Sequence, residues 1–193
     1  MSERVKIILD KNADILRLPA IALRGLVVFP GNIIHFEVGR KKSIAAIEWA
    51  MSNNNAVFLT AQQDMDVEDP GFKDLYAYGV VAEVKQVLRV SDELVKVLVE
   101  GKYRAKLLTL DSSGRFLLAS TKAAALRGTK SVDSARVEAL VRSVKEAFEE
   151  YLSLNPRLSK DVVYTIITNE DAALLCDYIP ANLLLKYTDK QAL

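Results

Sequence analysis

The sequence has few of the residues from which catalytic and metal-binding sites are usually built. Its 193 residues include one cysteine, Cys176, and one histidine, His35. A single cysteine excludes a disulfide within the chain and is typical of a reducing compartment. No second histidine, cysteine or carboxylate cluster lies at metal-ligand spacing near His35. We therefore expect His35 to be a partly exposed strand residue and Cys176 to be a small core residue on a helix.

Net charge and long apolar runs are also lacking. With 26 basic and 25 acidic residues the formal net charge is +1, so no overall field attracts nucleic acid, an anionic membrane or acidic substrates. No stretch approaches the ~18 apolar residues of a membrane span. The apolar part of the leader Met1–Asp14, Val5–Leu9, is shorter than the ~7 to 15 residues of a secretory core. We expect a protein that is neither exported nor membrane-bound, and hence a cytoplasmic location.

Motifs of nucleotide binding and nucleophilic catalysis are missing as well. Gly128–Ser131 lacks the first glycine of the phosphate-binding loop G-x-x-x-x-G-K-[ST], and no serine lies in G-x-S-x-G. The acidic loop from Asp64 to Asp69 lacks the glycine and the final glutamate of a calcium loop. The residues therefore predict no cofactor, no metal and no catalytic group.

What the sequence does contain is a strong β-hairpin pattern. Over Gly79–Gly101 two apolar runs alternate with polar residues at period two, on either side of the polar loop Ser91–Glu93. The side chains expected to point inward are Val80, Ala82, Val84, Leu88, Val90, Val95, Val97 and Val99. Because a lone hairpin is only marginally stable, these faces must be covered by other strands or a helix.

Further short strands and one helix flank the hairpin. The helical spacing of apolar residues over Arg40–Met51 predicts a single covering helix. The other predicted strands are three short runs within Leu18–Gly39 and the runs Val57–Ala61, Tyr103–Leu110 and Phe116–Lys122. About six strands suffice for a closed or nearly closed sheet, which leaves few exposed edges.

From about Ala124 the apolar period changes to 3.6, which predicts helices. A long amphipathic helix is expected over Val132–Leu154, ended by Asn155 and Pro156. The expected N-caps of two shorter helices are Ser159 and Asn169, the second helix being stopped by Pro180. The predicted fold is therefore α+β, with a β-rich lobe over residues 1–123 and a helical lobe over residues 124–193.

The last residues indicate where this lobe continues. Thr188–Gln191 matches the capping box S/T-x-x-E/Q, which places a helix start close to Leu193. A helix start needs a helix after it, because isolated turns do not nucleate. We therefore expect the chain to be part of a longer protein, truncated within the helical lobe.

Candidate binding residues gather at one corner of the β-rich lobe. Apolar side chains crowd the turn formed by Pro30 and Gly31, and positive charge opens the following helix at the end where the macrodipole disfavours it. The ordinary interpretation is core packing and solvated charge; the alternative is a patch that holds unfolded polypeptide. The candidate polypeptide-binding residues are Phe29, Pro30, Ile33, Ile34, Phe36, Arg40, Lys41 and Lys42.

Two segments resemble the N-terminal domain of the ATP-dependent protease Lon of bacterial type. The first is LPAIALRGLVVFPGNIIHFEVGRKKSIAAIEWAM, against the family form LPxLPLRxxVxFPxxxxPLxVGRxKSIxAIExA. The second is GVVAEVKQVLRVSDELVKVLVEGKYRAKL, against G-x-x-A-x-I-x-Q-x-L-K-L-P-D-G-x-x-K-V-L-V-E-G-x-x-R-A, with EDPGFKDLYAYG between the two. The resemblance covers about Leu18–Ala105. It departs from the family at Ser91–Glu93, which replaces a Pro-Asp-Gly turn, and at Ala22 and His35, where prolines are common.

The resemblance implies a pseudo-barrel of the PUA-like kind followed by an α-helical bundle. It further implies that an absent continuation carries the AAA+ ATPase, with its ATP and Mg, and the Ser-Lys peptidase of a cytosolic homohexamer. This part would recognise unfolded or damaged protein substrates and support assembly with other Lon subunits, without being an enzyme itself.

Three other interpretations remain. A free-standing Lon-domain binding protein without a protease would be excluded by a gene that continues past Leu193. A nucleic-acid-binding pseudo-barrel is less favoured, because no basic stripe with interleaved aromatic residues is present; salt-sensitive RNA or DNA binding would support it. An independent enzyme is the least favoured.

Overall fold

The computed structural model describes residues 15–91, 93–124, 134–155 and 158–193. The predictions made for the leader Met1–Asp14, for Gly128–Ser131 and for the helix stop at Pro156 lie outside these residues. No helix in the described part of the chain is long and apolar enough to cross a membrane.

The chain divides into two compact units. The first unit spans Met1–Ala124 and also includes Leu185–Leu193, and the second unit spans Ala125–Leu184. The first unit contains the strands, whereas the second is helical, and the predicted α+β class is confirmed. The lobe boundary after residue 123 stays a prediction; the contacts of Leu185–Leu193 group these residues with the strands.

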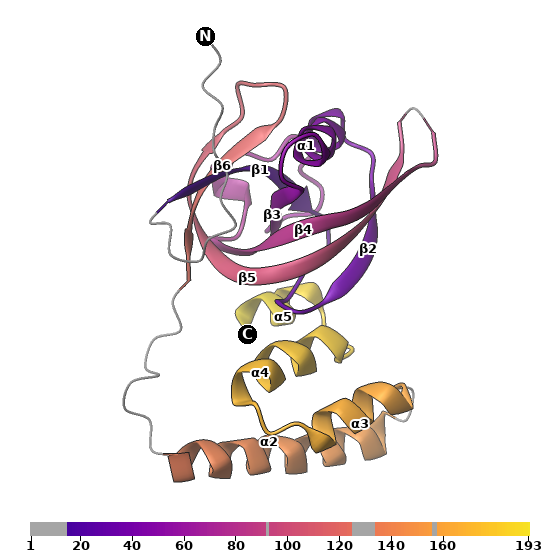
Figure 1. Ribbon diagram of the computed structural model, residues 1–193, viewed down its shortest axis with the longest axis vertical. Helices are drawn as coiled ribbons and strands as arrows, with labels where there is room; N and C mark the ends of the chain where they lie inside the picture. Colours follow the sequence, from indigo (N-terminus) through magenta and orange to yellow (C-terminus); the bar gives the residue numbers. More distant parts are fainter. Residues whose placement is uncertain (1–14, 92, 125–133, 156–157) are drawn as a thin grey trace. The chain divides into compact units, whose positions relative to one another are not determined.

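The first unit is a six-stranded sheet that closes into a barrel (Figure 1). Its strands are β1 (Leu16–Leu23), β2 (Ile33–Val38), β3 (Ala56–Ala61), β4 (Tyr78–Arg89), β5 (Val95–Asp111) and β6 (Leu117–Ala123). The strand order is β2-β5-β4-β3-β1-β6, and an additional β5–β6 pairing joins the sheet into a ring. β1 and β3 run parallel, while the other pairs are antiparallel. β2 stands outside the ring, paired to β5.

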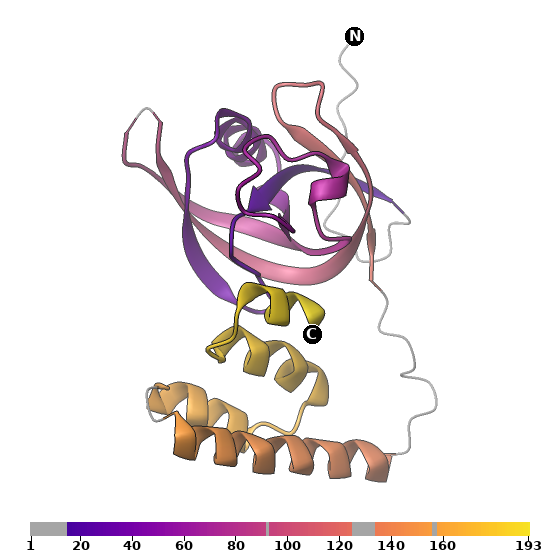
Figure 2. The same ribbon diagram turned by 180° about the vertical axis from the view of Figure 1, so that it is seen from behind.

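The long strand β5 pairs with three other strands of the sheet. One of its edges pairs with β4, and its other edge is shared by β2, along Val95–Glu100, and β6, along Ala105–Asp111. Figure 2 shows β2 beside the first half of β5. The sequence predicted a break at Gly101 and a separate strand from Tyr103, but β5 continues through both positions. Gly101 does not end the strand; it is the point where the neighbouring strand changes from β2 to β6.

The predicted hairpin is confirmed as β4 and β5, with one correction near its tip. Val95, Val97 and Val99 are buried as expected, whereas Leu88 and Val90 are 58% and 56% exposed. The β4–β5 register shifts between Val84 and Gln86. Such an irregularity reverses the alternation beyond it, and the side chains expected inward therefore face solvent.

The middle apolar run of Leu18–Gly39 is not a strand, in contrast to the prediction. Residues 26–29 lie between Gly25 and Gly31, whose positive φ angles of 63° and 74° turn the chain at both ends. Val28 and Phe29 are buried nevertheless. The run therefore contributes side chains to the core without joining the ladder.

The predicted covering helix is confirmed as α1 (Lys41–Met51). Ala46, Ile47 and Ala50 are buried in a core cluster that also holds the inward valines of β4 and β5. A second cluster, around Leu18, Phe58 and other residues of β1, β3 and β6, fills the remainder of the barrel.

The second unit contains three helices in the described residues, α2 (Ser134–Leu154), α3 (Lys160–Thr168) and α4 (Ala172–Asn182). They pack around Val141, Phe148, Ile166 and Leu175. The predicted amphipathic helix is confirmed over the described part of its range.

Details of this unit differ from the prediction. Ser159 caps α3 as expected, since its side chain accepts a hydrogen bond from the Val162 N–H. α4 is capped by Asp171 instead of Asn169, because Asn169 closes α3. Pro180 lies within the last turns of α4 instead of ending it, and Cys176, expected in the core, is exposed on the same helix.

Two short helices complete the first unit, η1 (Phe72–Asp74) and α5 (Tyr187–Ala192). The expected helix start near Leu193 is present, but the N-cap is Lys186 instead of Thr188. The Tyr187 hydroxyl donates to the Gln63 carbonyl at 3.0 Å, and the Gln191 amide donates to the Tyr78 carbonyl at 3.1 Å. These bonds hold α5 on the strand unit.

Candidate functional site

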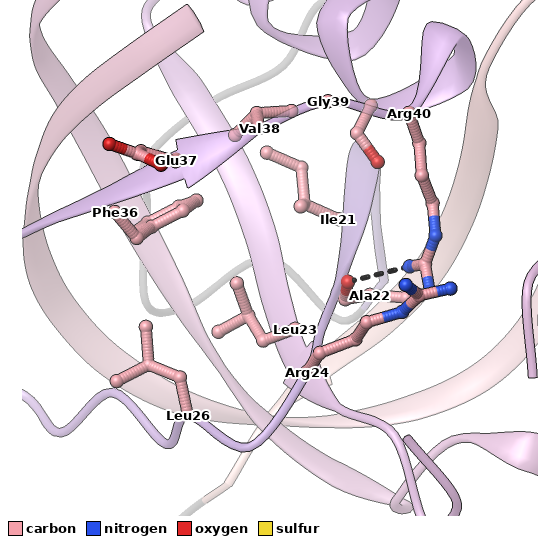
Figure 3. Close-up of a pocket in the computed structure, with 11 residues that line it drawn as sticks. Ile21, Ala22, Leu23, Arg24, Leu26, Phe36, Glu37, Val38, Gly39 and Arg40 are labelled. Carbon is pink, nitrogen blue, oxygen red and sulfur yellow. Dashed lines mark hydrogen bonds between the residues drawn. The ribbon is translucent and has the colours of Figure 1, made fainter. Parts of the chain in front are cut away.

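The ring of strands is closed along the first half of β1 and open along the second half. β6 covers β1 only along Leu16–Ala20, so among the described strands the last residues of β1 pair with β3 alone. β2 likewise has β5 on one side and no described strand on the other. A pocket of about 310 Å³ lies between these two unpaired edges (Figure 3).

The pocket has an apolar floor and polar walls. Its apolar residues come from the end of β1, the following segment and β2, and they are Ile21, Leu23, Leu26, Phe36 and Val38. Its polar side chains are Arg24, Glu37, Arg40 and Ser43. In Figure 3 the guanidinium groups of Arg24 and Arg40 lie close together on one side, and the Glu37 carboxylate lies on the opposite side.

Arg40 is fixed in place by neutral acceptors. It precedes α1, and its guanidinium donates to the carbonyls of Ala22 and Val67, both at 3.1 Å, and to the Gln62 amide oxygen at 2.5 Å. Gln62 is itself fully buried and donates to the Val67 carbonyl at 2.9 Å. This arginine therefore joins β1, the start of α1 and the loop after β3.

The electrostatic environment of Arg40 leaves its charge incompletely compensated. Burial and then the neighbouring Arg24 lower the pKa of Arg40 below its usual value, and Asp69 and Glu68 act in the opposite direction. Arg24 donates to the same Val67 carbonyl at 3.3 Å. None of the ion pairs among the described residues involves either arginine. The wall that they form is therefore positively charged.

Ser43, a largely buried residue, adds a hydroxyl to this wall. It lies in the first turn of α1, lines the pocket and is only 5% exposed. No hydrogen bond links its hydroxyl to any residue that the structure describes. The first turn of α1 contains no acidic residue, and its N-cap makes no side-chain hydrogen bond. This end of α1 therefore lacks the acceptor that normally satisfies its N–H groups.

The predicted site residues fall into three groups, the first of which is the corner formed by Phe29 and Pro30. Phe29 is 3% exposed, and the Arg104 guanidinium lies over its ring, 5.6 Å from the ring centre. The Phe29 side chain is therefore not accessible to a ligand. Pro30, next in the chain, is half-buried. The corner is held against β5, because Gly31 N donates to the Gly101 carbonyl at 2.8 Å and Gly101 N donates to the Asn32 carbonyl at 2.9 Å.

The second group lies on β2, where exposed and half-buried residues alternate. Ile33 is 62% exposed and His35 is exposed as predicted, while Ile34 and Phe36 pack against the core. Since Asn32 bonds to Gly101, the alternation of an antiparallel pair turns the backbone groups of residues 34, 36 and 38 toward β5. The backbone groups of residues 33, 35 and 37 then face the open side, where another strand can add.

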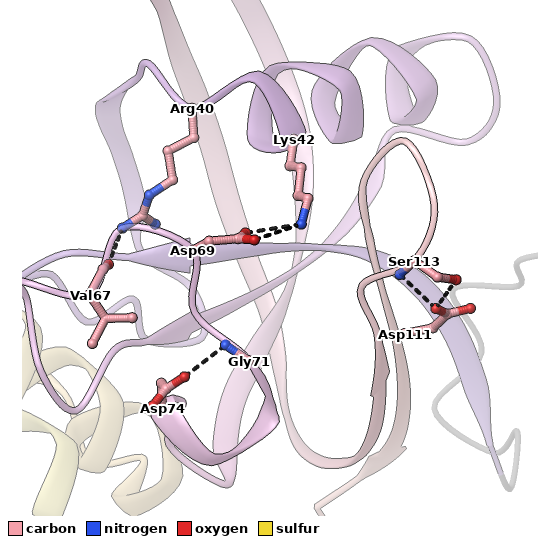
Figure 4. Close-up of polar contacts among 8 residues, drawn as sticks. All are labelled: Arg40, Lys42, Val67, Asp69, Gly71, Asp74, Asp111 and Ser113. Carbon is pink, nitrogen blue, oxygen red and sulfur yellow. Dashed lines mark hydrogen bonds and ion pairs between the residues drawn. The ribbon is translucent and has the colours of Figure 1, made fainter.

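The third group consists of the three basic residues at the start of α1, whose side chains lie in different surroundings. Arg40 points to the pocket wall, Lys41 is exposed, and Lys42 pairs with both carboxylate oxygens of Asp69 at 3.0 Å (Figure 4). The acidic loop is thus tied to α1. No group of three potential metal ligands occurs in the described residues.

Sequence reasoning missed Arg24, Leu26 and Ser43, which line the pocket, and Gln62 and Val67, which hold Arg40 in place. Arg24 and Gln62 each follow an apolar strand run directly, which is a detectable position for a side chain at a barrel opening. The convergence of donors on the Val67 carbonyl has no local signal, because Arg24 and Val67 are far apart in the sequence.

The described residues thus define an α+β domain, in which a small barrel with an unpaired edge strand is followed by a helical unit. A family model described as the ATP-dependent protease La (LON) substrate-binding domain matches residues 17–193. The chain therefore belongs to the Lon substrate-binding domain family.

Individual relatives agree with this assignment. The chain is 38% identical over 180 residues to a Lon protease of Desulforamulus reducens, covering 93% of this chain and 22% of the relative. It is 36% identical over 182 residues to the Lon protease of Escherichia coli, with 94% and 23% covered. The chain thus spans about 22% of the length of the curated relatives it matches.

A solved structure shares the fold. The N-terminal domain of the Mycobacterium avium complex Lon protease superposes with a TM-score of 0.63 at 16% identity, covering 91% of this chain and 94% of that chain. The resemblance to the Lon N-terminal domain inferred from the sequence is confirmed.

Proposed function

We propose that the chain is a non-catalytic substrate-recognition and assembly module of a Lon-type ATP-dependent serine protease. The observation that carries the proposal is the match of residues 17–193 to the substrate-binding domain family. The pocket at the open end of the barrel supports it, since it offers an apolar floor beside an unpaired strand edge.

Unfolded or damaged polypeptide would bind in extended form along β2. Its backbone would bond to the outward groups of residues 33, 35 and 37, its side chains would contact Ile33, and one apolar side chain would enter the pocket. A buried large apolar side chain contributes roughly 1.5 to 3 kcal/mol before ordering costs are subtracted. One or two anchors give only modest affinity, which suits a module that must also release its substrate.

The proposed polypeptide-binding residues remain Phe29, Pro30, Ile33, Ile34, Phe36, Arg40, Lys41 and Lys42. Of these, Ile33 and Lys41 are exposed, whereas buried Phe29 would act by supporting the corner from which β2 starts. Arg24 and Ser43 join the proposed site because they line the pocket.

We propose that ATP hydrolysis and peptide-bond cleavage are carried out by other parts of the whole protein. The ATPase, with ATP and Mg, and the serine peptidase would lie outside this chain, in a cytoplasmic homohexamer to which neighbouring subunits contribute. In that arrangement this chain captures substrates and supports assembly, and it hydrolyses neither ATP nor peptide bonds.

Binding of an unfolded polypeptide tests the proposal. The probe is a fluorescently labelled protein that has been reduced and carboxymethylated, so that it cannot refold, compared with its native form. We expect the 193-residue chain to bind the unfolded probe and not the native one. Ile33→Ser should weaken binding about five- to tenfold, because one exposed anchor loses much of its apolar area.

Ile15→Ser is the matched control, since Ile15 is similarly exposed but precedes β1 and does not belong to β2. It should leave the affinity unchanged. If the chain fails to bind any unfolded probe, the proposed function is wrong. If both isoleucine variants bind as the wild type does, polypeptide uses another surface.

A further inference from the structure

The positive wall of the pocket has more hydrogen-bond donors than acceptors. Arg24, Arg40 and Gln62 all donate to the one carbonyl oxygen of Val67, although a carbonyl oxygen has only two lone pairs. Of the five N–H groups of a guanidinium, Arg40 uses three and Arg24 uses one in the described hydrogen bonds. Donors of both arginines therefore remain for a ligand with acceptor oxygens.

The Ser43 hydroxyl points to the same kind of ligand. Ser43 is only 5% exposed and lines the pocket, and its hydroxyl makes no hydrogen bond to the described residues. Its oxygen is not among the fully buried atoms that lack a partner, so the hydroxyl is open to the pocket and can donate to an incoming acceptor. Together with the uncapped first turn of α1, it supplies neutral donors next to two positive charges.

The apolar floor limits which anion fits. Leu23, Leu26 and Phe36 offer nothing to a fully hydrated inorganic ion, but they favour an apolar group attached to the anion. We propose that the pocket binds the C-terminal residue of a polypeptide, with its carboxylate on Arg24, Arg40 and Ser43 and its apolar side chain on the floor. This inference rests on the proposed function, because it names the part of a substrate that the site recognises.

A chain terminus fits both the positive wall and the apolar floor of the pocket better than an internal acidic segment does. In an extended chain, successive side chains point to opposite faces, so an aspartate and its apolar neighbour cannot enter one pocket together. A C-terminal residue carries its carboxylate and its apolar side chain on the same α-carbon. Capture of a terminal carboxylate by clustered backbone and side-chain donors is a known recognition mode.

The acidic groups near the pocket do not neutralise this arrangement. Asp69 is engaged by Lys42 at 3.0 Å, and Glu37 lies across the pocket from the guanidinium groups in Figure 3. Glu68 acts on Arg40 through space, but its influence is weaker than that of burial and Arg24 on the pKa of Arg40. Glu37 would instead disfavour a second carboxylate on the residue before the terminus.

Short labelled peptides test the proposal on the full 193-residue chain by fluorescence anisotropy. The first peptide carries an N-terminal fluorophore and ends in leucine with a free carboxylate; the second is the same peptide as its C-terminal amide. A third ends in leucine followed by aspartic acid amide and so offers a side-chain carboxylate only. We expect the free acid to bind at least about tenfold more tightly than either amide, as for a charge-assisted hydrogen bond.

Arg24→Gln and Ser43→Ala should each reduce the preference for the free acid, Arg24→Gln by about tenfold, while the affinity for the amide stays constant. Arg24 is exposed and makes one described hydrogen bond, so its substitution should leave the fold intact. Arg115→Gln is the matched control: Arg115 is an exposed arginine of the first unit outside the pocket lining, with an ion pair to Glu48. Arg115→Gln should leave the preference for the free acid unchanged.

Equal binding of the free acid and its amide, or an unchanged preference in Arg24→Gln, would overturn the inference. Equal binding of the peptide with the side-chain carboxylate would overturn the assignment to a chain terminus. The carboxymethylated probe, measured on the same samples, separates this inference from the proposed function. If that probe binds while the free carboxylate has no effect, only the pocket assignment fails.

Discussion

Substitution of Gly101 by alanine tests how the fold positions the site. A Cβ atom at residue 101 would lie 2.3 Å from the Phe29 carbonyl oxygen and 3.0 Å from the Phe29 carbonyl carbon. Both are backbone atoms, so the overlap cannot be relieved by rotating a side chain. Either β5 or the Phe29–Asn32 corner must move.

The expected cost follows from two contributions. Overpacking that forces a backbone shift costs typically 1 to 3 kcal/mol. The shift also strains or breaks the hydrogen bonds of Gly101 with Gly31 and Asn32, each worth about 1 kcal/mol. We expect Gly101→Ala to lower the free energy of unfolding of the first unit by about 3 to 5 kcal/mol. That is a large part of the roughly 5 to 15 kcal/mol of a typical domain.

Urea denaturation followed by Trp49 fluorescence measures this effect on the correct unit. Trp49 is the one tryptophan of the chain and lies in α1, with its ring centre 5.7 Å from that of Phe116. With a slope of about 2 kcal/mol per molar urea, the midpoint should fall by roughly 2 M. The helical unit contains no tryptophan and does not contribute to the signal.

Gly114→Ala is the matched control, because the nearest atom to a Cβ at residue 114 is 3.7 Å away, which is ordinary contact. Its midpoint should stay close to that of the wild type. Were Gly101→Ala to unfold at the wild-type midpoint, the close approach of the corner to β5 would not exist in solution. The corner would then not hold β2 at the barrel opening.

Two further predictions concern surface groups. On the outer faces of β4 and β5, Lys85 and Lys102 bridge Glu83 and Glu100 at 2.7 to 2.9 Å, and hydrogen bonds from Lys102 and then Lys85 lower the pKa of Glu100 to about 2. A carboxyl with a depressed pKa stabilises the fold above its unfolded pKa, about 4.3, and loses this contribution as the pH falls toward 2. Glu100→Gln should therefore flatten the acid dependence of the urea midpoint in that range, although only by a small amount because the network is exposed. The control Glu93→Gln should leave this dependence as it is in the wild type. Identical acid profiles for Glu100→Gln and the wild type would contradict the ion-pair geometry. The exposed Cys176 should react with the thiol reagent DTNB in the native protein nearly as fast as in urea, whereas protection until unfolding would restore the core position expected from the sequence.

The hairpin and α1 could be predicted because their signals are local. The inward valines of β5 alternate without interruption, and the apolar spacing over Arg40–Met51 fits one helical face. The prediction for Leu88 was wrong because one register shift after Val84 reverses the alternation, and period-two patterns carry no information on such shifts. Cys176 was misplaced for a similar reason, since helical spacing shows which residues share a face but not which face is covered.

The site was only partly predictable because it is assembled across long sequence separations. The turn at Pro30 and Gly31 is present as predicted, whereas its binding role stays a prediction. Phe29 is buried, because the glycines on either side turn the run inward. Arg40 attracted attention as a misplaced charge at a helix start. Its acceptors lie in β1 and in the loop after β3, and no local pattern links these segments.

The position of the pocket follows from the length of β5. β5 has 17 residues, whereas β2 and β6 have 6 and 7, so β2 occupies the first half of its second edge and β6 the second half. β6 can therefore close the ring against β1 only over its own half, and the other half must stay open. Gly101 marks the change of partner, and its missing side chain lets the Phe29–Asn32 corner approach β5 and lead directly into β2. The opening and the unpaired edge are thus consequences of one long strand shared between two shorter ones, which is why a substitution at Gly101 should affect both stability and polypeptide binding.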